Sequence, residues 1–364
     1  MNRRILVGIT SIIIVIILLG TVYFKQQDVE PIKIGGILIL TGSGSSWGLN
    51  SHRGADLAIE EINSEGGVNG RQLEIVYENN IGDDPRVAVS VFYKLFREGI
   101  DIMIGPNWSE SGLALAPLAC DKKVLMISPS LGVAGFNEEC DYVFNLWPHD
   151  SLLSVELGKR IYDDGYRTIA ILGSQQAWEQ EQSYAVKSGF ENSGGEVISF
   201  QLPSKNEVNF SQEIQNIIMV NPEAIVITAF IHQAEIAKKI VEARVTLPIY
   251  LALLDVNTVT TAEGSLEEAI SITSFTPNQE FIGSFVNKYG VPPDIGSDTS
   301  YDAIKLIAKA IEETGSTDPT ILKDYINQLD YYEGVSGNLV FDGKGGVTKV
   351  YKMLTVKNDV IIAK

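Results

Sequence analysis

Three short polar side chains stand at the ends of two apolar runs, and their types suit hydrogen bonding to a small polar ligand. Residues 100–104 and 124–127 are apolar and have the length of buried parallel strands. Asn107 and Ser109 follow the first run, and Ser130 follows the second. In open α/β sheets, ligands bind where strand ends meet helix N-termini, because the unpaired N–H groups there favour an anion. The pattern predicts half of a site for a carboxylate or a similar polar head.

A purely structural interpretation of the same residues stays open. Ser109 can cap a helix predicted over residues 109–123, and Ser130 can close a turn, without either side chain touching a ligand.

Two enzyme classes fit the sequence less well. Gly42, Gly44 and Gly48 follow a strand, but their spacing is one residue too long for a dinucleotide-binding fingerprint. His149 and His232 can border a cleft, so residue types alone leave a serine hydrolase open. The one Gly-x-Ser-x-Gly match, Gly44-Ser45-Ser46-Trp47-Gly48, lies in the same glycine-rich turn and is a weak signal by itself. We therefore expect a binding protein and not an enzyme.

The composition is that of a folded, acidic protein. The 364 residues suffice for roughly two domains, with 45% hydrophobic and 20% charged residues. The formal net charge of −18 argues against nucleic acid as a partner.

The N-terminus indicates export. Arg3 and Arg4 precede the largely apolar run 5–24, which is long enough to span a bilayer with the remainder of the chain outside the cytoplasm. No good cleavage site follows, so we expect an N-terminal transmembrane helix as a membrane anchor, with a linker up to residue 31. A cleaved signal peptide, leaving a secreted or periplasmic protein, is the alternative.

Cys120 and Cys140 are the only cysteines, and they lie on the exported side, where disulfides persist. A bridge between them would hold the loop after the second apolar run in shape. Two free thiols are the alternative. No histidine stands near them at ligand spacing, so we expect no metal and no cofactor.

Strands and helices alternate in two successive series, which predicts an α/β fold with parallel sheets and right-handed crossovers. The first series has predicted strands at 32–40, 73–77, 100–104 and 124–127, with a glycine-rich turn over 41–48 and helices at 55–63, 86–98 and 109–123. The second has predicted strands at 168–172, 196–201, 224–228, 249–254 and 269–275, with helices at 151–164, 181–192, 210–219 and 233–243. Helices at 279–289, 298–313 and 320–329 and strands at 337–341, 350–356 and 360–363 end the chain.

The order of several short motifs from Ile32 onward resembles a known family. These motifs are Thr41-Gly42 with Trp47-Gly48, Gly66-Gly67-Val68-Asn69-Gly70, Ile104-Gly105-Pro106 with Ser109, Ile127-Ser128-Pro129-Ser130, Ser300-Tyr301-Asp302-Ala303, and Gly334-Val335-Ser336-Gly337. The chain resembles the type I periplasmic solute-binding proteins, the branched-chain amino-acid (Leu/Ile/Val)-binding family of ABC transporters.

The resemblance implies two doubly wound parallel-sheet lobes joined by a hinge that the chain crosses three times. The crossings are expected near Trp147-Pro148, Thr276-Pro277 and 333–337. Lobe 1 would comprise 32–147 and 277–334, and lobe 2 would comprise 148–276 and 335–364. Such a hinge couples ligand contacts in both lobes to closure.

The resemblance also implies site residues. Ser109 matches a serine that binds the ligand carboxylate, and Ser130 and Gly132 fall where backbone and hydroxyl groups bind carboxylate and amine. Gly132 replaces a threonine, so one hydroxyl is missing. The other implied ligand-binding residues are Trp47, Trp178, Tyr301, Phe230 or His232, and Asp255, the only candidate for the carboxylate that holds a ligand ammonium.

The implied function is the extracytoplasmic receptor of an ABC importer, which binds an amino acid or a related small carboxylate or amide and delivers it to permease subunits. A membrane-tethered sensor domain of the same fold is the alternative.

Overall fold

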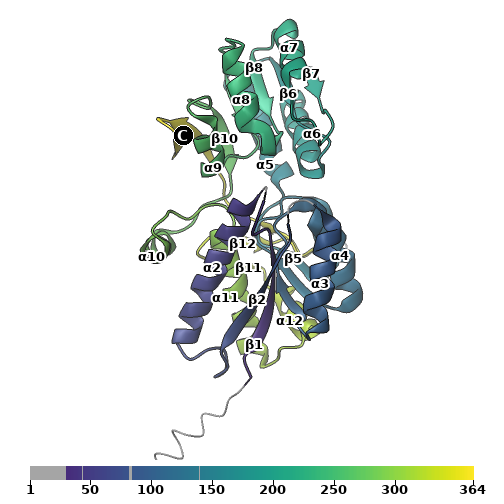
Figure 1. Ribbon diagram of the computed structural model, residues 1–364, viewed down its shortest axis with the longest axis vertical. Helices are drawn as coiled ribbons and strands as arrows, with labels where there is room; N and C mark the ends of the chain where they lie inside the picture. Colours follow the sequence, from purple (N-terminus) through teal and green to yellow (C-terminus); the bar gives the residue numbers. More distant parts are fainter. Residues whose placement is uncertain (1–29, 43, 82–83, 139) are drawn as a thin grey trace, which may run out of the picture.

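The computed structural model describes residues 30–42, 44–81, 84–138 and 140–364, which form two α/β lobes stacked along the long axis of the molecule (Figure 1). Within these ranges, no helix combines the length and the apolar character that crossing a bilayer requires. The predicted anchor at 5–24 lies outside the described residues.

The first lobe is built on a five-stranded sheet whose pairings are all parallel, in the order β2-β1-β3-β4-β5. Apolar side chains of α2, α10, α11 and α12 pack on one face, and those of α3 and α4 pack on the other. This double cover explains why the central strands are apolar throughout. The strands are β1 (Ile32–Leu38), β2 (Leu73–Asn79), β3 (Ile102–Ile104), β4 (Leu125–Ser128) and β5 (Val143–Asn145), and the helices are α2 (Ser45–Ser64), α3 (Pro85–Arg97), α4 (Ser109–Lys122), α10 (Gln279–Tyr289), α11 (Ser297–Thr314) and α12 (Pro319–Ile326).

The second lobe repeats this plan. Its seven-stranded sheet has the order β15-β14-β10-β9-β8-β6-β7, with β6 to β10 parallel and the C-terminal hairpin antiparallel at one edge. Helices α5 and α6 cover one face, and α7, α8 and α9 cover the other. The strands are β6 (Thr168–Leu172), β7 (Glu196–Gln201), β8 (Ala224–Ile227), β9 (Ile249–Leu251), β10 (Ile270–Thr273), β14 (Lys352–Lys357) and β15 (Val360–Ala363), and the helices are α5 (Asp150–Asp163), α6 (Ala177–Asn192), α7 (Ser211–Val220), α8 (Gln233–Glu242) and α9 (Val256–Ala262).

The predicted boundary after residue 334 is wrong, because the chain stays with the first lobe for longer. Strands β11 (Tyr331–Gly334), β12 (Gly337–Phe341) and β13 (Val347–Thr348) form a small antiparallel sheet. Leu339 and Val347 are buried in the apolar core of the first lobe. The third crossing therefore lies near residues 349–351, directly before β14 joins the second lobe.

The glycine-rich turn predicted over 41–48 is also shorter than expected, because α2 begins at Ser45. Gly44 precedes it with a φ of 79°, in the left-handed region that suits glycine. Gly48 lies inside the helix for a packing reason: a Cβ there would stand 1.8 Å from the carbonyl oxygen of Ile39. The glycine lets the helix approach β1 closely and sets Trp47 in the first helical turn.

A buried charge pair lies where the lobes join. The side chains of Lys349, on the third crossing, and Asp298, in the first turn of α11, are both fully buried, with Nζ and Oδ2 3.9 Å apart. Lys349 Nζ also stands 5.9 Å from the ring centroid of Trp147, on the first crossing. Burial lowers the pKa of Lys349 and raises that of Asp298, while each charge opposes the shift of the other.

Candidate functional site

Both sheets place their topological switch points toward the same cleft. In each lobe the parallel strands run in the order second, first, third, fourth, fifth, which puts the switch point between β1 and β3 and between β6 and β8. Ligands bind at such points in open α/β sheets. The segments that follow these four strands, together with those that follow β4 and β5, line a cavity whose empty volume, part of it open to solvent, is about 380 Å³. Its lining residues are Trp47, Asn107, Trp108, Ser109, Ser130, Gly132, Asp150, Gln176, Trp178, Glu179, Phe230 and Ile231.

One end of the cavity carries hydrogen-bond donors without partners. Ile39 N–H donates to Asn107 Oδ1 (3.2 Å), which leaves the Asn107 Nδ2 amide group without a described partner. Trp108 Nε1 and Ser130 Oγ are likewise buried, and neither has a hydrogen-bond partner among the residues that the structure describes. Ser109 is the first residue of α4, whose N-terminal N–H groups and dipole favour negative charge. A buried polar group without a partner is costly, so this end is suited to an anionic or accepting ligand group.

Aromatic rings form the wall between the two lobes. Trp47 of the first lobe and Phe230 of the second have ring centroids 4.9 Å apart, and Trp178 stands 6.1 Å from Phe230. Trp108 completes the group at 6.2 Å from Trp47. These rings suit an apolar part of a ligand or a cation above their faces.

Two buried acids line the second-lobe side of the cavity, and sequence analysis missed both. Asp150 begins α5 and is 4% exposed; its carboxylate accepts from Trp147 Nε1 and Trp178 Nε1, each at 2.7 Å. Glu179 is 3% exposed and accepts from Ser174 Oγ and from the Ile231 N–H (3.2 Å). Burial raises the pKa of each carboxyl to about 7 against these hydrogen bonds, which favour the charged form. The sequence gives little sign of their role: Asp150 directly follows Trp147-Pro148-His149, and Glu179 directly follows Trp178.

Contacts across the cleft hold the lobes together around the cavity. Trp47 Nε1 donates to Asp255 Oδ2 (2.8 Å), and Gln176 Nε2 donates to Glu110 Oε2 (2.9 Å). Each bond joins a side chain of one lobe to a side chain of the other. The cavity therefore belongs to the closed arrangement of the two lobes.

The structure brings most of the predicted site residues to this cavity. Those that line it are Trp47, Asn107, Ser109, Ser130, Gly132, Trp178 and Phe230. Their contact with a ligand stays a prediction.

Three predicted residues lie elsewhere. Asp255 caps α9 by accepting from the Thr258 N–H (2.7 Å) while it holds the Trp47 indole, so it supports the wall instead of lining the cavity. Tyr301 packs in the core of the first lobe and donates to the Glu61 carboxylate. His232 turns away toward Phe210, with its ring centroid 5.2 Å from that ring.

The missing hydroxyl at Gly132 has a steric explanation. A Cβ at this position would stand 1.8 Å from Asp150 Oδ2 and 2.9 Å from Trp178 Nε1. A threonine could not fit unless Asp150 moved. Gly132 therefore makes room for a carboxylate that points toward the cavity.

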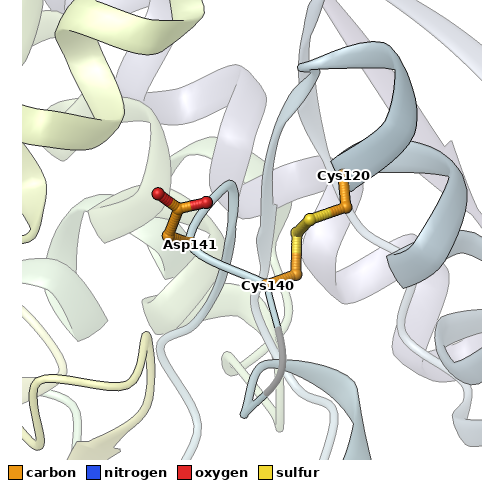
Figure 2. A group of neighbouring side chains, drawn as sticks. All are labelled: Cys120, Cys140 and Asp141. Carbon is orange, nitrogen blue, oxygen red and sulfur yellow. A yellow bond between two sulfur atoms is a disulfide. The ribbon is translucent and has the colours of Figure 1, made fainter.

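Cys120 and Cys140 form a disulfide that closes the loop between α4 and β5, with Cα atoms 5.8 Å apart (Figure 2). Asp141 lies beside them, and these three residues are the described group whose spacing would suit a metal ion. Because the sulfur atoms are bonded to each other and the Asp141 carboxylate pairs with Lys323, we assign this group no metal. The loop carries Ser130 and Gly132 and thereby one wall of the cavity.

Replacing both cysteines by serine should lower the free energy of unfolding by about 3 kcal/mol, because the unfolded chain gains the entropy of an open loop. Chemical denaturation measures the loss. Reductant should lower the free energy of unfolding of the unmodified protein by a similar amount and leave that of the double variant unchanged. Equal stability with and without reductant would contradict a structural bridge.

With the geometry in place, comparison with known proteins decides the family. A sequence model described as periplasmic binding protein matches residues 31–359. The chain belongs to the periplasmic binding protein family. A leucine-, isoleucine-, valine-, threonine- and alanine-binding protein of Pseudomonas aeruginosa is 28% identical over 338 residues, which cover 89% of this chain and 88% of that protein.

Solved structures share the fold of this periplasmic binding protein. A leucine-binding protein of Thermotoga maritima superposes with a TM-score of 0.85 at 23% identity, covering 92% of this chain and 97% of that one. A solute-binding protein of R. palustris in complex with 4-hydroxybenzoate superposes with a TM-score of 0.84 at 20% identity, covering 92% and 96%. Structural neighbours thus include binders of both amino acids and aromatic acids.

Proposed function

We propose that this protein is the extracytoplasmic receptor of an ABC importer and captures a small amino acid, or a related carboxylate, between its lobes. The observation that carries the proposal is the cavity at two facing switch points, whose buried donors have no partner in the part of the chain that the structure describes. A ligand carboxylate there would accept from Asn107 Nδ2, Trp108 Nε1 and Ser130 Oγ, and it would face the N-terminus of α4. The amino-acid-binding names of its sequence relatives support the same ligand class.

A thermal-shift screen over amino acids, amides and small acids tests the proposal. A true ligand raises the melting temperature progressively with its concentration, because it binds only the folded state. Native mass spectrometry then gives the stoichiometry, for which one ligand per chain is expected. Permease subunits that co-purify with the receptor would support import, whereas a co-purifying signalling protein would favour the sensor alternative.

Ser109→Ala should weaken binding of the best ligand from this screen by about 1–3 kcal/mol, because a buried ligand oxygen would lose a donor. Isothermal titration calorimetry measures the change. Ser188→Ala, at an exposed position of α6, is the matched control and should leave the affinity as it was. An unaltered Kd in Ser109→Ala would exclude Ser109 from the carboxylate site.

A further inference from the structure

Given the receptor role proposed above, on which this step rests, we infer that the ligand carries a cationic nitrogen, which sits between Asp150 and Glu179 and against the indole rings. The cavity would then accept zwitterionic or cationic solutes and reject plain carboxylates such as benzoate. This assignment gives the ammonium-binding role to two residues other than Asp255.

The first argument for a cationic nitrogen is the charge of the residues that line the cavity. The twelve residues that line the cavity include two carboxylic acids and no Lys, Arg or His. A plain carboxylate bound here would bring a third acid into a buried site with no cation, and like charges in a low-dielectric site repel strongly. A cationic nitrogen in the same cavity would offset the acids.

The second argument is the hydrogen-bonding capacity of the Asp150 carboxylate. A carboxylate oxygen accepts two hydrogen bonds, and each Asp150 oxygen has one described partner, an indole N–H. Both Asp150 oxygens can therefore accept a second donor. A Cβ at position 132 would stand 1.8 Å from Oδ2, so the glycine lets this carboxylate take its position beside the cavity. The adjoining faces of Trp47, Trp178 and Phe230 add cation–π attraction.

Binding of a cation should also expel protons from this pair. Glu181 of α6 acts on Asp150, and Glu110 of α4 acts on Glu179; both neighbours are acidic and add to the effect of burial. With a pKa of about 7 in the empty site, each acid is substantially protonated just below neutral pH. A cationic nitrogen binds the charged form better, so protons compete with it. Affinity should therefore fall as the pH falls from 7.5 to 5.5, by up to about tenfold per pH unit for each acid that must lose its proton.

Two matched compound sets test the inference by calorimetry at pH 7.5. They are leucine with 4-methylpentanoate and 3-methylbutylamine, and phenylalanine with 3-phenylpropanoate and 2-phenylethylamine, with benzoate as a further acid. We expect an amino acid of at least one set to bind and its des-amino acid to bind at least about 100-fold more weakly. The affinity of that amino acid should fall at least about tenfold on going to pH 5.5.

Variants assign the effect to the two acids. Asp150→Asn and Glu179→Gln should each weaken amino-acid binding by about tenfold or more. In each variant, the ratio of the affinity for the amino acid to that for its des-amino acid should fall, and the affinity should depend less on pH. Glu191→Gln, which removes an exposed acid of α6 that does not line the cavity, is the control and should change affinity less than about threefold. Thermal unfolding checks that each variant folds. If Asp150→Asn does not fold, Glu179→Gln still tests the inference.

The outcomes separate this inference from the receptor proposal. Tight binding of benzoate or of a des-amino acid, with neither acid variant altering it, would overturn the cation site and leave the receptor proposal standing. Failure of every amino acid, acid and amine to bind would overturn both.

Discussion

Lys349→Met is expected to lower the free energy of unfolding by about 3–5 kcal/mol at pH 8, because it leaves the buried Asp298 carboxylate without its cation. The Lys349 and Asp298 side chains are fully buried at the junction of the lobes, and neither charged atom has a hydrogen-bond partner among the described residues. Denaturant unfolding at pH 8 measures the loss.

The pH dependence of this loss has a definite sign. Burial raises the pKa of Asp298 in the folded protein, and removing Lys349 raises it further. The folded variant then binds a proton more readily than the unfolded chain does, so its deficit should shrink as the pH is lowered from 8 toward 5.

The double variant Lys349→Met/Asp298→Asn is the matched control. It removes both charges and should recover most of the stability, since a buried pair replaced as a whole is often neutral to stability. A single variant as stable as the unmodified protein at pH 8 would show that the pair does not stabilise the fold.

Trp47→Ala should weaken ligand binding by about 100-fold, since it removes the first-lobe ring that packs on Phe230 together with a bond across the cleft. Trp47 contacts Phe230 and Trp108 by its ring and Asp255 by its N–H. Calorimetry with the best amino acid from the screen measures the change. Binding as tight as that of the unmodified protein would remove Trp47 from the site.

Trp47→Phe separates the ring from the hydrogen bond. It keeps an aromatic surface against Phe230 but leaves Asp255 without the indole donor. Asp255 also lies near the partly buried Asp294, whose pKa is raised to about 6 by desolvation and by the Asp255 charge. Losing the donor should therefore disfavour the closed state and weaken binding by about tenfold. Small-angle scattering should show a larger open fraction in this variant than in the unmodified protein.

Local patterns along the chain predicted the elements that set up the site. The apolar runs before Asn107 and Ser130 are buried strands β3 and β4, and the helix between them begins at Ser109. Such strand predictions succeed because burial on both faces of a parallel sheet leaves a continuous apolar run in the sequence. The helix predicted over 86–98 is α3, where Pro85 takes the first position and Asp84 accepts from the Arg86 N–H.

Sequence patterns gave wrong predictions where the main contact of a residue is with a residue far away in the sequence. Gly48 resembles a turn residue in the sequence, yet it is a helical glycine that packs against the backbone of Ile39, directly after β1. Asp255 stands where the resemblance puts an acid for the ligand, yet its carboxylate is taken up by Trp47, more than 200 residues earlier. Neither partner can be read from the residues nearby.

The sequence by itself determined the two α/β series, the strand ends that carry polar groups, and the kind of protein. Only the tertiary structure decided which polar groups share one cavity, because that depends on how the hinge brings the second lobe's switch point against the first. Asp150 and Glu179 enter the candidate site by this route. Each looks like an ordinary helix-start acid in the sequence. In the fold both are buried, because Asp150 lies against Trp147 and Trp178, and Glu179 against Ser174 and Ile231, at the junction of the lobes.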